Sequence, residues 1–132
     1  MKARVVLWLL AAALLTACGD GRGTLPAQQW GKNVVQVEVR PSVPRVGMNE
    51  FLVVVSDARR RPVYDLIVSL RTGDDQKWRQ AIQDGRTGVY RRAVRVDDPR
   101  TQVLQVKLQR RNGEETILRF PIAAALEGPS GG

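Results

Sequence analysis

Short segments of alternating apolar and polar residues run through the chain from residue 33 to residue 122, with turn-forming residues between them. Alternation with a period of two gives a strand one apolar face, whereas an amphipathic helix would repeat every three to four residues. Seven such segments predict an all-β fold, a seven-stranded antiparallel immunoglobulin-like sandwich. The residues expected to face its core are Val37, Phe51, Val53, Leu66, Val68, Tyr90, Val94, Leu104, Val106, Leu118 and Phe120.

The turns and strand starts carry polar residues that we interpret as structural. The pairs Asp74-Asp75 and Asp97-Asp98 could supply two catalytic carboxylates or calcium ligands. Both pairs stand in turn signals, where aspartate favours bonds to the local backbone. Tyr90 is expected to form a tyrosine corner, in which its hydroxyl bonds to nearby backbone.

The first 17 residues form a segment of a different kind. Lys2 and Arg4 precede an apolar run from Val5 to Leu15, which is shorter than the ~20 residues that a membrane-spanning helix needs. A basic start, a short apolar run and small residues at the end are typical of a secretory signal peptide. We therefore expect a signal helix over residues 1–17 that is cleaved from the mature protein.

The last residues of this segment, Leu15, Thr16 and Ala17 with the following Cys18, resemble the lipobox of bacterial lipoproteins. In that family the bond before the cysteine is cleaved, its thiol receives a diacylglycerol, and its amino group receives an acyl chain. The resemblance implies lipidation of Cys18 and a lipid anchor in the cell envelope. In the family the next residue influences sorting, so Gly19 favours the periplasmic face of the outer membrane. The aspartate one place further leaves the inner membrane open.

Two stretches beside the predicted sandwich lack the alternating pattern. Residues 18–32 are expected to hold the lipidated cysteine and a Gly-rich flexible tether, and residues 123–132 a flexible tail. Trp30, near the end of the tether, is expected to pack against the sandwich, with contact to a partner as the alternative. The sandwich domain is therefore predicted to span residues 33–122.

The chain is strongly basic, with 21 Lys and Arg against 13 Asp and Glu, no histidine and a net charge of +8. Loss of Lys2 and Arg4 with the signal peptide lowers this charge to +6. Nearly all of the positive charge is arginine, whose planar fork suits phosphates and carboxylates. We expect an anionic partner, either an envelope protein or a membrane head group. So basic a chain would usually bind nucleic acid, but export to the envelope argues against that partner.

Arginines are concentrated in the predicted loops. Successive connections in an immunoglobulin-like sandwich alternate between its two ends, so the loops 57–62, 84–88 and 110–114 should share one end. With a first strand that starts at residue 33, the tether would enter at that end and turn the basic loops toward the membrane. Arg91-Arg92 should split across the two faces of a strand. The residues expected to contact an anionic surface, rather than simply to face solvent, are Arg59, Arg60, Arg61, Arg86, Arg110 and Arg111.

The residue types that common catalytic and metal sites need are scarce. Without histidine the chain cannot form a Ser–His or Cys–His pair. Because lipid uses Cys18, the mature protein has no disulfide, and Met48 alone cannot hold copper. We expect neither an enzyme nor a metal site, and no cofactor besides the lipid on Cys18.

Three short motifs resemble the FixH/YtkA-like domain: Pro44–Phe51, Arg61-Pro62-Val63 and Gly88-Val89-Tyr90. Members of that family are exported or membrane-tethered immunoglobulin-like sandwiches, and some are linked to copper handling. The resemblance covers about residues 33–122. The expected function is a non-enzymatic, lipid-anchored envelope protein whose sandwich binds or scaffolds a partner. The alternative is a metallochaperone-like or respiratory and copper-assembly accessory role, which the absence of histidine disfavours.

Overall fold

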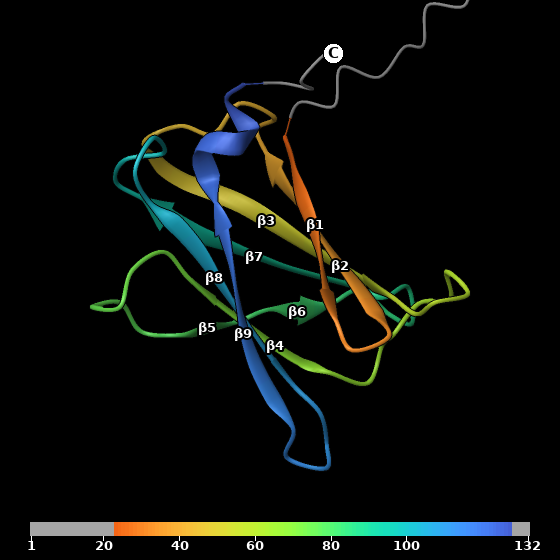
Figure 1. Ribbon diagram of the computed structural model, residues 1–132. Coiled ribbons are helices and arrows are strands. Elements are labelled where there is room, and N and C mark those ends of the chain that lie inside the picture. Colours follow the sequence, from red (N-terminus) through yellow and green to blue (C-terminus); the bar gives the residue numbers. More distant parts are fainter. Residues whose placement is uncertain (1–22, 128–132) are drawn as a thin grey trace, which may run out of the picture.

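The computed structural model describes residues 23–127, which form two antiparallel β-sheets (Figure 1). The first sheet contains, in spatial order, β1 (Thr24–Trp30), β2 (Asn33–Arg40), β3 (Gly47–Ser56), β7 (Val89–Val96) and β6 (Ile82–Gln83). The second contains β5 (Arg79–Gln80), β4 (Ile67–Arg71), β8 (Val103–Gln109) and β9 (Glu115–Pro121). A single turn of 3₁₀-helix, η2 (Ile122–Ala125), follows β9. The predicted signal peptide and Cys18 lie outside the described residues.

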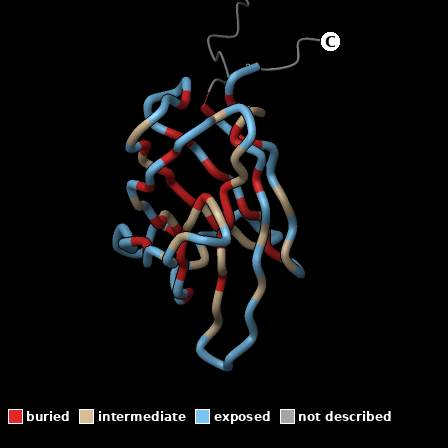
Figure 2. Tube along the Cα trace, turned by 90° about the vertical axis from the view of Figure 1, so that its left-hand side faces the viewer, coloured by how far each residue is buried: buried red, intermediate tan, exposed pale blue. Residues whose placement is uncertain are grey.

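The core lies between the two sheets. Because side chains of a strand alternate between its two faces, one face of each strand points into this core. Figure 2 shows the buried residues along the middle of the molecule and the exposed ones around it. The predicted core is confirmed except at Leu118, which is only half-buried on the edge strand β9. The core also contains Leu25, Val35, Val39, Val55, Leu70, Ala81, Val96, Leu108, Ile122 and Ala125. The all-β expectation therefore holds at the level of two packed antiparallel sheets.

The tether prediction is wrong over residues 24–30, because these residues form the edge strand β1. β1 pairs with β2 from Thr24↔Glu38 to Trp30↔Asn33. Leu25 is 1 % exposed and packs in the core. The register shifts between Leu25 and Gln28, which is where Pro26 stands, and an edge strand tolerates a proline at such an irregularity. The folded unit thus starts about ten residues earlier than the alternation predicted.

The segment around Trp78 and Ile82 is divided between the two sheets. β5 pairs with β4 and β6 pairs with β7. Ala81, between them, is buried and donates its backbone N–H to the carbonyl of Val68 at 2.7 Å. With β1 and this division, the described residues form nine strands instead of the predicted seven.

The C-terminal boundary also differs from the prediction. The predicted tail begins at residue 123, but η2 continues to Ala125 and packs beside β1. Ala125 is 1 % exposed and Ile122 is fully buried. The core therefore includes Ala125, which the sequence pattern had assigned to a tail.

The connections divide between two ends of the sandwich. The β1–β2 turn and the loops 57–66, 84–88 and 110–114 lie toward the lower and right-hand side of Figure 1. The start of β1, the β2–β3 loop and η2 lie at the top. Within residues 23–127, no helix has the length and apolar character needed to cross a bilayer.

Candidate functional site

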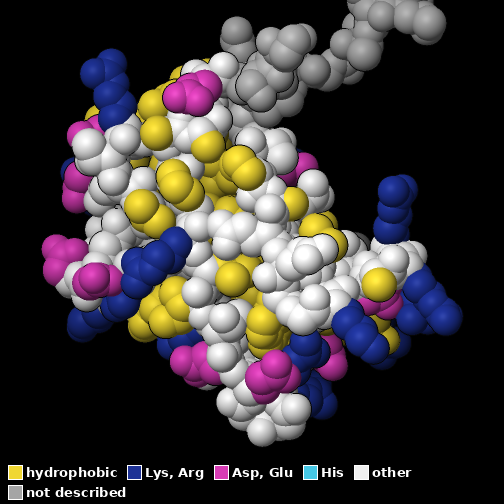
Figure 3. Space-filling model, in the orientation of Figure 1, with side chains coloured by type: hydrophobic (Ala, Val, Ile, Leu, Met, Phe, Trp, Pro, Cys, Tyr) yellow, Lys and Arg dark blue, Asp and Glu magenta, His cyan; other side chains and the backbone are white. Residues whose placement is uncertain are grey.

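The basic end of the sandwich is defined here as the β1–β2 turn with the loops 57–66, 84–88 and 110–114. The strand register fixes this grouping, since Val34 pairs with Ser56, Val54 with Val89, and Ile67 with Gln109. In Figure 3, Lys and Arg side chains gather at the right-hand end of the molecule. The structure therefore places the predicted loops at one end. The candidate residues at this end are Arg59, Arg60, Arg61, Arg86, Arg110 and Arg111.

Asp57 organises the loop that carries three consecutive arginines. Its Oδ1 accepts the backbone N–H groups of Arg59 at 2.8 Å and Arg61 at 2.9 Å. Its Oδ2 lies 2.9 Å from the Nε of Arg61. The backbone hydrogen bond from Arg61, together with that from Arg59 and the Arg61 guanidinium, lowers the pKa of Asp57 from its ordinary value. The carboxylate is thus engaged by the loop and by Arg61, and Arg59 and Arg60 form no ion pair among the described residues.

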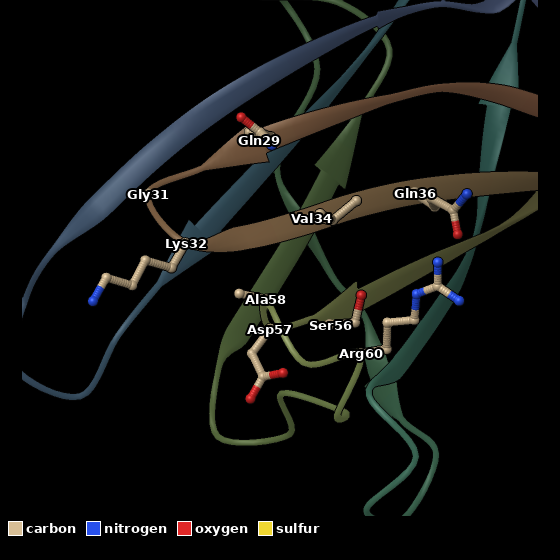
Figure 4. A pocket seen from close by; sticks show the side chains of 9 residues that line it. All are labelled: Gln29, Gly31, Lys32, Val34, Gln36, Ser56, Asp57, Ala58 and Arg60. Atoms are coloured by element: carbon tan, nitrogen blue, oxygen red, sulfur yellow. The ribbon is translucent and has the colours of Figure 1, made fainter.

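Arg60 stands in a backbone conformation that is unusual for its residue type. Its φ is 62°, in the left-handed region that disfavours residues with a Cβ. The turn that imposes this φ is closed by the Arg60 N–H on the Asp57 carbonyl and the Asp57 N–H on the Arg61 carbonyl, both at 2.9 Å. Figure 4 shows the Arg60 side chain extended toward Gln36 of β2. Such strain is characteristic of functional loops.

A shallow groove of about 760 Å³ lies beside Arg60. Lys32 and Arg60 supply its positive charges. Among the described residues, Asp57, already bonded to its own loop, is the only acidic one that lines it. In Figure 4 the side chains of Lys32 and Asp57 point away from the Arg60 guanidinium. The groove is therefore open, polar and positively charged.

The remaining arginines of the basic end fall into two groups. The Cζ of Arg110 lies 4.3 Å from the centre of the Trp30 ring, and its Nε lies 3.0 Å from the Glu114 carboxylate. Arg86 lies over Tyr64 at 5.4 Å and lines a hollow of about 420 Å³ together with Arg111. The predicted residues therefore share one end but do not form one continuous patch.

Trp30 packs against the core, as expected, and also carries Arg110 on its ring. The sequence did not indicate this pairing, because 80 residues separate the two positions. A half-buried tryptophan beside an arginine forms a favourable cation–π contact. The contact fixes the direction in which the 110–114 hairpin leaves the sandwich.

The expectation that the tether enters at the basic end is wrong. The additional strand β1 precedes β2 and runs antiparallel to it. Gly23, just before β1, accepts the N–H of Val39 at 2.6 Å, near the end of β2. The chain therefore enters the sandwich at the end opposite the basic loops. One unrecognised strand reverses the orientation that the seven-strand count implied.

Of the aspartates interpreted as structural, Asp98 bonds to the local backbone as expected, whereas the Asp74 carboxylate bonds to side chains instead. Asp98 Oδ1 accepts the N–H of Arg100 at 2.9 Å. Asp74 Oδ1 accepts the Gln105 amide at 2.6 Å and lies 3.3 Å from Arg71. Within the described range, no three His, Cys, Asp or Glu side chains are grouped to hold a metal ion. Met48 lies in β3 with its side chain 53 % exposed, so it is neither a loop residue nor a core residue.

Tyr90 bonds to backbone that is far away in sequence, not to the nearby backbone that was expected. Its hydroxyl donates to the carbonyl of Val63 at 2.9 Å and accepts the N–H of Leu66 at 3.3 Å. Burial raises the pKa of this hydroxyl. Tyr90 therefore ties the 57–66 loop to β7.

Comparison with known proteins gave no matching family model, no similar curated protein and no similar solved structure.

Proposed function

We propose that this protein is a non-enzymatic, lipid-anchored protein of the cell envelope whose β-sandwich binds an envelope protein with an acidic surface. The observation that supports the binding surface is the 57–61 loop. Asp57 fixes this loop, and among residues 23–127 Arg59 and Arg60 have no carboxylate partner. Ordered arginines attract acidic partners and orient them on approach.

The direction of the basic end favours one of the two anionic partners considered from the sequence. The five residue-to-residue steps from Cys18 to Gly23 can span at most about 18 Å. A lipid on Cys18 would hold the Gly23 end near its membrane. The ten residues of β3 put the basic end roughly 33 Å further away. Head groups of the anchoring membrane would then be out of reach, which favours a protein partner.

The immunoglobulin-like class and the FixH/YtkA-like resemblance belong to this proposal. Their support is that two of the three motifs pack together. A Cβ on Gly88 would lie 2.7 Å from the Val55 carbonyl and 3.0 Å from the Pro62 ring, and Tyr90 bonds to Val63. The metallochaperone-like alternative rests on the resemblance alone. Copper binding at micromolar or tighter affinity in a calorimetric titration would favour it.

The partner is tested by mild crosslinking of the lipidated protein in the envelope. A variant with Arg59→Ser and Arg60→Asn removes two charges from the basic end, and asparagine tolerates the left-handed φ. The matched control, Arg45→Ser with Arg100→Asn, removes two exposed charges from the opposite end. We expect the crosslinked complex to disappear in the first variant alone. Equal yields of the crosslinked complex from both variants would contradict the role of the basic end.

The anchor is tested separately with Cys18→Ser. Long acyl chains contribute ~0.8 kcal/mol for each buried methylene, so two or three of them hold a protein firmly in a membrane. We expect the variant to lose lipidation and processing, as measured by metabolic labelling with a fatty acid. Labelling equal to that of the native chain would refute lipidation at this cysteine.

A further inference from the structure

A second groove lies on the side of the sandwich, between the segment that leads into β5 and the strand β7. Its volume is about 340 Å³, within the range of sites that hold small ligands. Four cations, Lys77, Arg79, Arg92 and Arg95, line it together with Met48 and Ala93. Within the part of the chain that the structure describes, no acidic residue contributes to its lining. This groove is separate from the basic end.

Arg92 occupies a position where the strand pattern places a core residue. Tyr90 and Val94, on the same face of β7, are both buried. The residue opposite Arg92 on β3 is Phe51, which is 0 % exposed. Arg92 is half-buried beside them, as the predicted split of Arg91 and Arg92 across two faces requires. A guanidinium held against a core is stabilised by a counter-anion that can reach it.

The described residues supply no such anion at this groove. Lys77, Arg79 and Arg92 have no ion pair and no side-chain hydrogen bond within residues 23–127, whereas Arg95 lies 3.0 Å from Asp97. Several arginines elsewhere on the described chain, such as Arg61, are paired with a carboxylate. The groove therefore concentrates uncompensated positive charge around one inward-facing arginine.

We propose that this groove binds a phosphate group. The Arg92 guanidinium would bind the phosphate through two parallel hydrogen bonds, and Lys77 and Arg79 would add charge at the rim. Several cations match the roughly −2 charge of a phosphate monoester better than they match the charge of a single carboxylate. Met48 and Ala93 leave an apolar wall for the organic part of the ligand. The phosphate belongs either to a soluble ester or to a lipid head group.

The position of the groove makes both sources reachable. Gly23 bonds to Val39, Val39 pairs with Phe51, and Phe51 pairs with Arg92, so these residues form one row across the sheet. With adjacent strands ~4.8 Å apart, Arg92 lies roughly 14 Å from the point where the chain enters. The groove is thus in the half of the molecule that a lipid on Cys18 would hold near the membrane. Binding of a lipid head group depends on the proposed lipid anchor, whereas the site itself does not.

The test is a calorimetric titration of the full chain, in a neutral detergent, with inorganic pyrophosphate. We expect saturable binding that Arg92→Gln weakens about tenfold or more, because it removes charge-assisted hydrogen bonds. Lys77→Gln with Arg79→Gln should weaken it similarly without touching the core, since both residues are exposed. The matched control is Arg91→Gln, which removes a charge from a neighbouring residue of β7 that does not line the groove and lies 3.6 Å from Asp84, so it should leave affinity unchanged.

Two further arms distinguish the sources of the phosphate. Micelles doped with phosphatidylglycerol will lower the apparent pyrophosphate affinity if head groups occupy the groove, and phosphatidylcholine serves as the zwitterionic comparison. If the affinity for pyrophosphate is unchanged in micelles with either lipid, the site is assigned to a soluble phosphate. The proposal is overturned if the native chain does not bind pyrophosphate, or if Arg92→Gln and the double variant bind it as tightly as Arg91→Gln does.

Discussion

The hydroxyl of Tyr90 and the backbone carbonyl of Val63 form a 2.9 Å hydrogen bond across 27 residues of sequence. The same oxygen accepts the N–H of Leu66, so one phenol holds the second half of the connection between β3 and β4. This connection continues directly from the arginines of the basic end. The core and the candidate site are therefore coupled through one buried side chain.

Tyr90→Phe should lower the free energy of unfolding by about 1–3 kcal/mol, because it leaves a buried N–H and a part-buried carbonyl without their partner. The measurement is denaturant unfolding at pH 7. Since the folded pKa of Tyr90 is raised, the hydroxyl's contribution is complete below the unfolded pKa near 10 and is lost as pH rises through the folded pKa. The phenylalanine variant should lack this alkaline decline. An unchanged alkaline profile would contradict the assignment.

Asp57 should contribute to stability in the opposite pH range. Its pKa is lowered from 3.8 in the folded protein, so its contribution is present above the unfolded pKa and is lost as pH falls through the folded value. Asp57→Asn should flatten this part of the acid unfolding profile, as measured by circular dichroism. The control is Asp65→Asn. Asp65 lies in the same connection, but its carboxylate accepts no backbone N–H from the loop. If both variants flatten the profile equally, the Asp57 hydrogen bonds are not the cause.

Arg60→Gly should stabilise the protein while removing a charge from the basic end. Glycine adopts the φ of 62° without the steric cost that a Cβ adds, so we expect a gain of up to about 1 kcal/mol in the free energy of unfolding. Thermal unfolding measures this gain. Arg59→Gly, outside the left-handed region, should give no gain. A loss of stability in Arg60→Gly would show that contacts of the arginine outweigh its backbone strain.

Leu25→Ala tests whether residues 24–30 belong to the folded unit. A leucine that is 1 % exposed leaves a cavity when truncated, so the free energy of unfolding should fall by about 2–5 kcal/mol. Val46→Ala, at a side chain that is 65 % exposed, should stay within ~0.5 kcal/mol of the native chain. Chemical denaturation compares the two. A tether would tolerate both substitutions alike.

The central strands could be predicted from sequence because each buries one whole face, so the period-two pattern is complete. In β2, Val35, Val37 and Val39 alternate with exposed residues over the full strand. β1 escaped prediction because an edge strand needs little burial and its register shift breaks the period, leaving Leu25 as its only fully buried residue. That omission then reversed the predicted point of entry of the chain.

The candidate sites were predictable to different degrees for a related reason. Loop positions follow from strand order, so the shared end of the basic loops could be expected. The engagement of Asp57 with its own loop, and the contact of Arg110 with Trp30, depend on side-chain geometry that no spacing encodes. The groove at Arg92 did leave a signal, since a charged residue stands in the core register of β7.

The placement of β1 also has a mechanical consequence. A pull between the Gly23 end and a partner held at the basic end would act along the length of β1. The ladder hydrogen bonds between β1 and β2 lie across that direction, so they would be loaded together in shear and would not unzip one after another. The strand that joins the sandwich to the preceding chain is thus oriented to resist being peeled away.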